Sequence, residues 1–399
     1  YDELTVEFSY KPVSMDNANE DFWLQISTNG GSSWTQINNN LPYKYISYIV
    51  VNPNDENTGF DVVALNIQEN GQRSPINYVT PPGVVREQLY NNNTIINQNE
   101  QSLSLRVYDK LGGTTNGLEN DDARAVFKNV NVDMRQFKKL RMFLHAEAVQ
   151  NGDLQDDELT AFIRFGNDFT DNFYQVEMPL KVTAYGASTP DEVWPSENDM
   201  EIPLNLLTKL KILALQNDPI ISIDLSGIGF VEEEAIGSSD NRLTLGIKGN
   251  PNFGDIRTLM VGLKNGSNRN DVCGSTWFNE LRMSDMDNEG GWATVVSMDA
   301  NFADFMNISA TGRQSTSGFG SLEQGPSQRS LEDVKQYDVV TNVNVGQLLP
   351  KKWGIQIPFN YGQGEELITP KYDEYYKDLT LDSRLAAADS NAEKEQINE

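Results

Sequence analysis

A change of residue pattern at Gly290 and Gly291 divides this sequence into two kinds of β structure. Upstream, short apolar runs are separated by polar loops rich in asparagine, glycine and threonine, which is typical of packed antiparallel strands. Downstream, apolar and polar residues alternate over stretches of about ten residues, the pattern of barrel strands with one face toward lipid and one toward water. We therefore expect a mainly β chain with a membrane-type sheet in its second part.

Three downstream stretches carry the alternation. Their apolar faces are Trp292, Thr294, Val296, Met298, Ala300 and Phe302; Val339, Thr341, Val343 and Val345; and Trp353, Ile355, Ile357, Phe359 and Tyr361. Their polar faces are Ser297, Asp299 and Asn301; Asp338, Asn342 and Asn344; and Gln356 and Asn360. Trp292, Trp353 and Tyr361 stand near the expected strand ends, where membrane barrels carry aromatic girdles. An ordinary antiparallel sheet with one hydrated face has the same periodicity, so the alternation alone leaves both interpretations open.

The segment 122–290 is predicted to be a jelly-roll-like β-sandwich, because it holds many short strands joined by long polar loops. The expected strands are Ala125–Phe127, Leu140–Ala146, Leu159–Phe165, Phe173–Leu180, Leu243–Ile247, Thr258–Leu263 and Trp277–Arg282. Leu206, Leu207 and Leu210 recur at helical spacing, which predicts a short amphipathic helix over Ile202–Leu215.

Composition sets the remaining boundaries. Residues 1–70 are predicted to form a β-sandwich-like segment, with a turn at Asn29-Gly30-Gly31. Residues 71–121 are an extended linker with a lead-in strand at Ser102–Tyr108. Residues 291–365 are predicted to hold transmembrane-type β-barrel strands, and residues 366–399 are predicted to form a charged loop and helix. Both chain ends lie inside patterned sequence, so we expect this chain to be part of a longer protein.

Charge and cysteine content exclude several classes of protein. The chain has 58 acidic and 31 basic residues and a formal net charge of −27, which argues against nucleic acid as a partner and disfavours anionic lipid surfaces. Its single cysteine, Cys273, excludes an intrachain disulfide and a multi-cysteine metal site. The sequence has no apolar run of about 18 residues, which leaves a closed barrel as the way to span a bilayer.

We predict no catalytic, cofactor-binding or metal-binding residues, and no enzyme activity. The single histidine, His145, lies within a predicted strand, where a packed or hydrogen-bonded core histidine is expected. Cys273 lies in a polar loop with no partner to activate it as a nucleophile. Phosphate-loop, dinucleotide and nucleophile-elbow motifs do not occur.

Acidic clusters are expected to be solvated loops. Asp285, Asp287, Glu289 and Gly290 match the first half of a calcium loop, but Val296 stands where the bidentate glutamate is needed. The clusters Asn54-Asp55-Glu56-Asn57 and Asp153 to Glu158 match such a loop less well. No cofactor is therefore predicted.

An ordered set of motifs gives a more specific indication. They are Pro81–Leu89, Asn92–Leu103, Asp122–Lys128, Gly249–Pro251, Trp277–Arg282, Gly318–Gln324 and Pro350–Ile355. In this order the sequence, over about residues 72–399, resembles the SprA/Sov family of giant cell-surface proteins of Bacteroidetes. Residues 1–70 lie outside this resemblance.

The resemblance implies a function in protein export. Members of that family form the outer-membrane translocon of the type IX secretion system, which also serves gliding motility. We therefore expect an outer-membrane, cell-surface location and partners among secreted cargo proteins, other type IX components and outer-membrane lipid. Asp299, Asn301, Asn342 and Asn344 would then face the lumen; the side chains expected to face lipid are Val339, Val343, Ile355 and Phe359.

Two other functions stay open from the sequence. The first is a secreted multi-sandwich adhesion or carbohydrate-binding protein, in which Trp23, Trp34 and Trp194 are candidates for stacking on sugars, although core packing explains each of them as well. The second is an enzyme, which has no positive support in the sequence. Membrane dependence separates the translocon from the adhesin, because barrel strands with open edges aggregate in water.

Overall fold

The computed structural model describes residues 25–26, 35–36, 48–50, 57–86, 88–91, 94–149, 153–223, 227–238, 242–267, 269, 271–287, 289–325, 328–388 and 390–398. The chain divides into two compact units, residues 1–47 and 48–399. In the first unit, the described residues form two short strands, β1 (Gln25–Ile26) and β2 (Thr35–Gln36), which pair antiparallel.

The largest sheet of the second unit has the antiparallel order β13-β14-β15-β11-β10-β16-β8-β3. Its strands are β3 (Tyr48–Val50), β8 (Ala123–Val132), β10 (Leu159–Gly166), β11 (Phe173–Pro179), β13 (Ser222–Ile223), β14 (Gly229–Glu232), β15 (Thr244–Lys248) and β16 (Ile256–Asn265). Strand β10 is buried on both faces, with Leu159 and Ile163 on one side and Phe162 on the other.

A second antiparallel sheet has the order β12-β9-β17-β7-β4. Its strands are β4 (Thr58–Asn66), β7 (Gln101–Asp109), β9 (Phe137–Ala148), β12 (Asp199–Pro203) and β17 (Gly274–Met286). Strands β5 (Gln88–Asn91) and β6 (Thr94–Asn97) form a separate hairpin. The pairing of β17 with β9 shifts between Asn279 and Arg282, where Glu280 has a φ of 50°.

Helices are short, and α3 (Leu204–Leu215) is the longest in the described part of the chain. The other helices are α1 (Ile67–Asn70), α2 (Pro190–Val193), α4 (Leu381–Ala387) and α5 (Asn391–Asn398), and the 3-10 turns are Ser196–Asn198, Glu233–Ile236, Phe253–Asp255, Val345–Leu348 and Lys351–Trp353. Helix α3 buries Leu206, Leu207 and Leu210, contacts β15 of one sheet and β9 of the other, and ends where Asn217 adopts a left-handed backbone. No helix among the described residues combines the length and apolar character needed to cross a bilayer.

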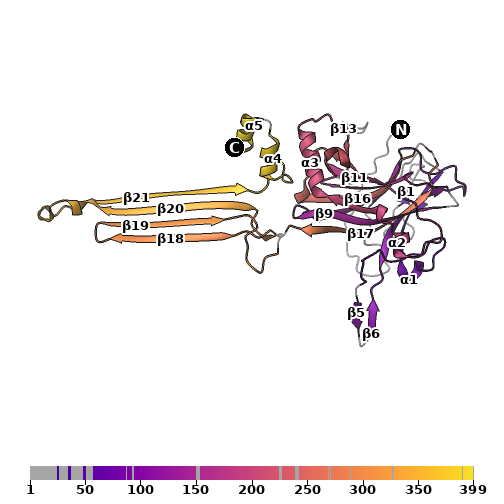
Figure 1. Ribbon diagram of the computed structural model, residues 1–399, viewed down its shortest axis with the longest axis horizontal. Helices are drawn as coiled ribbons and strands as arrows, with labels where there is room; N and C mark the ends of the chain where they lie inside the picture. The colour runs from indigo at the N-terminus through magenta and orange to yellow at the C-terminus, as the bar shows by residue number, and fades with distance from the viewer. Residues whose placement is uncertain are drawn as a thin grey trace. The chain divides into compact units, whose positions relative to one another are not determined.

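A third antiparallel sheet follows Gly291 and has the order β18-β19-β20-β21 (Figure 1). Its strands are β18 (Ala293–Phe302), β19 (Met306–Ser315), β20 (Glu332–Asn344) and β21 (Pro358–Pro370). Each strand pairs with the next one in sequence, so the sheet is an open meander with β18 and β21 at its edges.

The prediction of a mainly β, antiparallel chain is confirmed. The helix predicted over Ile202–Leu215 is α3, and the pattern change at Gly291 marks the start of the third sheet. The jelly-roll order, the closed barrel and the domain boundaries stay predictions.

Three details of the structure differ from the sequence prediction. Strand β19 was not predicted, because Gly312 and Gln314 interrupt its apolar alternation and only pairing with β18 and β20 fixes it. Trp353 and Ile355 do not belong to a strand. Trp353 ends a 3-10 turn that closes with Gly354 at a φ of 61°, and the strand begins at Pro358. The expected terminal helix is two helices, since α4 ends at Ala387 and α5 begins at Asn391.

Candidate functional site

The apolar side chains of the third sheet form one continuous face. The register aligns one residue from each of the four strands in every cross-strand row of this face. Counted from the β18–β19 turn toward the other end of the sheet, the five rows are Phe302, Met306, Val343 and Phe359; Ala300, Ile308, Thr341 and Tyr361; Met298, Ala310, Val339 and Gln363; Val296, Gly312, Tyr337 and Glu365; and Thr294, Gln314, Lys335 and Leu367. Large members of this face are strongly exposed, including Val296 at 64% and Phe359 at 54%. Soluble monomers rarely expose apolar side chains in such contiguous rows, so this face is the strongest candidate for an interaction surface.

The opposite face of the same sheet is mostly polar, with Val295 and Val340 as its large apolar members in the rows below. Its rows are Asn301, Asn307, Asn342 and Asn360; Asp299, Ser309, Val340 and Gly362; Ser297, Thr311, Asp338 and Gly364; and Val295, Arg313, Gln336 and Glu366. The first row places one asparagine on each of the four strands. Nδ2 of Asn360 donates a hydrogen bond to Oδ1 of Asn342 at 2.6 Å. Amide side chains can pair along such a row and still bond water, so this face suits an aqueous surface.

The structure confirms which predicted residues share a face. Asp299, Asn301 and Asn342 lie together on the polar face, and Val339, Val343 and Phe359 lie together on the apolar face. Ile355 lies outside the sheet, in the turn before β21. That turn is fixed in part by a hydrogen bond from the backbone N–H of Val345 to the carbonyl of Ile357 at 2.9 Å.

His145 is a core residue, as the sequence predicted. It is fully buried and stacks on Trp277 at a centroid distance of 3.8 Å, and its Nδ1 lies 2.7 Å from the carbonyl oxygen of Val193. Glu147 lies beside it and accepts two hydrogen bonds from Arg73, at 2.9 and 2.5 Å. Burial raises the pKa of Glu147, but His145 and Arg73 lower it by more, so the carboxylate stays ionised.

The tryptophan and the cysteine that the sequence analysis considered for sugar stacking and nucleophilic attack are buried in the protein interior. Trp194 is 3% exposed and its Nε1 donates to the carbonyl of Val79 at 2.8 Å, so it has no face free to stack on a sugar. Cys273 is 3% exposed, and burial raises the pKa of its thiol. Trp23, Trp34 and the acidic residues Asp55 and Glu56 lie outside the described residues.

Two carboxylates of the partial calcium-loop motif lie beside lysine ammonium groups of the same chain. Oδ2 of Asp287 lies 3.3 Å from Nζ of Lys371, and Oδ2 of Asp285 lies 3.6 Å from Nζ of Lys139. Within the described ranges, no three histidine, cysteine, aspartate or glutamate side chains are grouped so that they could hold a metal ion.

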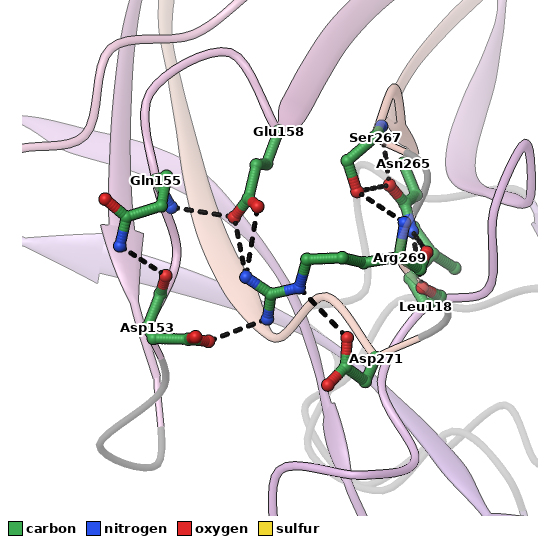
Figure 2. Close-up of polar contacts among 8 residues, drawn as sticks. All are labelled: Leu118, Asp153, Gln155, Glu158, Asn265, Ser267, Arg269 and Asp271. Atoms are coloured by element: carbon green, nitrogen blue, oxygen red, sulfur yellow. Dashed lines mark hydrogen bonds and ion pairs between the residues drawn. The ribbon is translucent and has the colours of Figure 1, made fainter.

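The acidic run from Asp153 to Glu158 pairs with two cations: Lys181 lies 2.6 Å from Oδ2 of Asp157, and Arg269 contacts the two ends of the run (Figure 2). Its Nη2 lies 2.7 Å from Oδ1 of Asp153, and its Nη1 lies 3.0 Å from Oε1 of Glu158. Its Nε donates to Oδ1 of Asp271 at 3.1 Å. Burial lowers the pKa of Arg269 and its three carboxylate neighbours raise it by more. The run is thus an ion-pair network on a solvated loop, since the side chain of Asp153 is 74% exposed.

Comparison with known proteins identifies the family of this chain. A family model described as a motility related/secretion protein, SprA_N, matches residues 24–385. The chain belongs to this family. No curated protein matches the chain.

The SprA_N match confirms the family resemblance and extends it. It begins at residue 24, so residues 24–70, which the motif comparison left outside the resemblance, are part of the family segment. It also runs through all four strands of the third sheet, which places the two-faced sheet inside the family's own sequence.

Sequence reasoning missed the contact that fixes the segment after β21. Asp378 is 4% exposed, and its Oδ1 lies 2.5 Å from Nζ of Lys211 on α3. Its other oxygen accepts a hydrogen bond from the hydroxyl of Tyr174 at 2.6 Å. The one available signal was Lys211 itself, a lysine among the leucines of an apolar helix face.

Proposed function

We propose that this chain is a segment of an outer-membrane protein-secretion translocon that conducts folded cargo proteins to the cell surface. The observation that carries the proposal is the register of the third sheet, which gives four consecutive strands one apolar and one polar face. Membership of a motility and secretion family supports an envelope location and export as the process.

The dimensions of the sheet support a membrane-spanning role. Strands β18 and β19 have 10 residues each, and β20 and β21 have 13 each. A tilted strand needs about 9–11 residues to cross a bilayer. The five rows from Lys335 to Val343 extend over about 26 Å along β20 at roughly 3.3 Å per residue. At a strand tilt of about 40° this corresponds to about 20 Å of membrane thickness, which lies within the apolar band of about 25 Å found on outer-membrane barrels.

The open edges of the sheet support a larger barrel. Strands β18 and β21 each have one neighbour in the described chain, and an unpaired strand edge is costly within a bilayer. In the proposed translocon, further strands of the parent protein pair with both edges and close the barrel. The polar face with Asn301, Asn342 and Asp299 then lines a water-filled lumen, and the upstream sheets form a jelly-roll-like sandwich beside it.

The proposed partners follow from this arrangement. Outer-membrane lipid contacts the apolar face, secreted cargo passes the polar face, and other type IX secretion components bind the parent protein. In this arrangement the net charge of −27 keeps the water-filled surface from adhering to cargo. No catalytic step is part of this function.

Two neighbouring valines on β20 give a matched test. Val339 lies on the apolar face at the middle row, and Val340 lies on the polar face. Val339→Lys is expected to cost about 2–4 kcal/mol of membrane insertion, because a lysine at the bilayer centre is poorly solvated. Val340→Lys is expected to insert as the unmodified protein does.

The experiment is outer-membrane fractionation of the parent protein in its host, together with an assay for release of exported proteins. Loss of both membrane protein and secretion for Val339→Lys, with both retained for Val340→Lys, supports the proposal. Release of the unmodified protein into the medium as a soluble species, or equal tolerance of the two lysines, contradicts it.

A further inference from the structure

A groove of about 410 Å³ lies on the third sheet. Its lining on the apolar face includes Val296, Gly312, Lys335, Tyr337, Glu365 and Leu367. These residues belong to the last two apolar rows, at the end of the sheet away from the β18–β19 turn. The groove therefore lies where the apolar face gives way to charged side chains.

Gly312 creates the groove. It stands between Val296 on β18 and Tyr337 on β20 in a single cross-strand row. No atom lies within 4 Å of the position that a Cβ would take at Gly312. The missing side chain therefore leaves a depression between Val296 and Tyr337 that a ligand on this face can enter.

The groove carries one available cation. In the five rows of the apolar face, from that of Phe302 to that of Thr294, the charged residues are Lys335 and Glu365. Glu365 accepts a hydrogen bond from the hydroxyl of Tyr337 at 3.0 Å. Lys335 makes no ion pair or side-chain hydrogen bond in the described part of the chain, and the register places Arg313 on the opposite face.

We infer that this groove binds a lipid whose headgroup carries a phosphate, with the phosphate on Lys335 and an acyl chain along Val296, Gly312 and Leu367. The inference rests on the proposed membrane location of the sheet. A lysine at the end of an apolar band extends its ammonium group to the bilayer interface, where phosphates are the available anions. The chain has a net charge of −27, so most of its surface repels anions. The unpaired ammonium group of Lys335 beside an apolar groove therefore favours a ligand that has both an anionic and an apolar part.

Three substitutions separate charge from shape. Lys335→Gln removes the cation and is expected to reduce lipid retention about tenfold, the loss of roughly one charged contact. Gly312→Val fills the groove while Lys335 stays, and it is expected to reduce retention as well. Glu365→Gln removes the nearby negative charge and is expected to keep or increase retention.

The test is native mass spectrometry of the purified parent protein in mild detergent, with phosphatidylglycerol as the probe. A galactolipid without phosphate tests the acyl chain alone, and inorganic phosphate tests the anion alone. Retention of phosphatidylglycerol only, with the three variants ordered as above, supports the inference. Equal retention of the galactolipid, competition by inorganic phosphate, or unchanged retention in Lys335→Gln and Gly312→Val overturns it.

Membrane fractionation of the same variants distinguishes this inference from the proposed function. All three variants are expected to stay in the outer membrane, because none places a charge in the middle rows. If they do so without any difference in lipid retention, the lipid site is wrong and the translocon stands. If the unmodified protein itself is absent from the membrane, both fail.

Discussion

Nζ of Lys211 and Oδ1 of Asp378 lie 2.5 Å apart, and both side chains are at most 2% exposed. The pair joins helix α3 to the segment that follows β21. Lys211 also donates to the carbonyl of Pro251 at 2.8 Å, and Tyr174 donates to the second oxygen of Asp378. The end of the two-faced sheet is thus connected to the upstream sheets by a fully buried ion pair.

Removing one partner of this pair is expected to be strongly destabilising. Asp378→Asn leaves Lys211 without a counter-charge in an apolar site, which costs about 3–5 kcal/mol. The double substitution Lys211→Met with Asp378→Leu is expected to recover most of that loss, because it leaves no buried charge. Chemical denaturation followed by tryptophan fluorescence measures both.

The exposed pair Arg257 and Asp255 is the matched control, since Arg257→Gln is expected to leave the denaturation midpoint unchanged. An Asp378→Asn protein with the same midpoint as the unmodified protein would show that the buried pair contributes nothing.

Glu147 is expected to make stability depend on pH. Its folded-state pKa lies below its unfolded value of about 4.3, so its contribution is present above that pH and is lost as the pH falls through the folded pKa. Glu147→Gln should therefore lower the unfolding midpoint at pH 7, with a difference from the unmodified protein that shrinks toward pH 3. Thermal unfolding monitored by circular dichroism over this range measures the effect. Glu323→Gln, at an exposed position, should give a curve parallel to the unmodified one.

The asparagine row is expected to strengthen the pairing of β20 with β21. Asn342→Val removes the acceptor for Nδ2 of Asn360, at a cost of roughly 1 kcal/mol, the usual net value of a hydrogen bond. Backbone amides of β21 should then exchange hydrogen faster, as measured by exchange mass spectrometry. Thr341→Val, on the other face of the same strand, is the control. Equal exchange in the two variants would mean that the row is not stabilising.

Cys273 is expected to be unreactive in the folded protein. It is 3% exposed, and burial raises the pKa of its thiol, so little thiolate is present and little reagent reaches it. Iodoacetamide should label it only after denaturant is added. A cysteine introduced by Leu322→Cys, at a fully exposed loop position, should react at once. Rapid labelling of native Cys273 would contradict its burial.

The candidate site could be predicted in part. The alternation around Val296, Met298 and Val339 predicted two faces for individual strands, because strand side chains alternate with a period of two. It did not predict β19, whose apolar face fades at Gly312. The alternation also did not predict the groove, because the groove exists only where the register places Gly312 between the large side chains of Val296 and Tyr337.

The sequence by itself determined that the chain is mainly β, that α3 is helical and that the pattern changes at Gly291, because these properties depend on local periodicity and turn residues. Only the tertiary structure shows the cross-strand rows and the buried pair of Lys211 with Asp378. The same holds for the ion pairs that Arg269 forms with three carboxylates. Each of these joins residues distant in sequence. Their pairing depends on strand register and on the low polarity of the interior, neither of which a local pattern records.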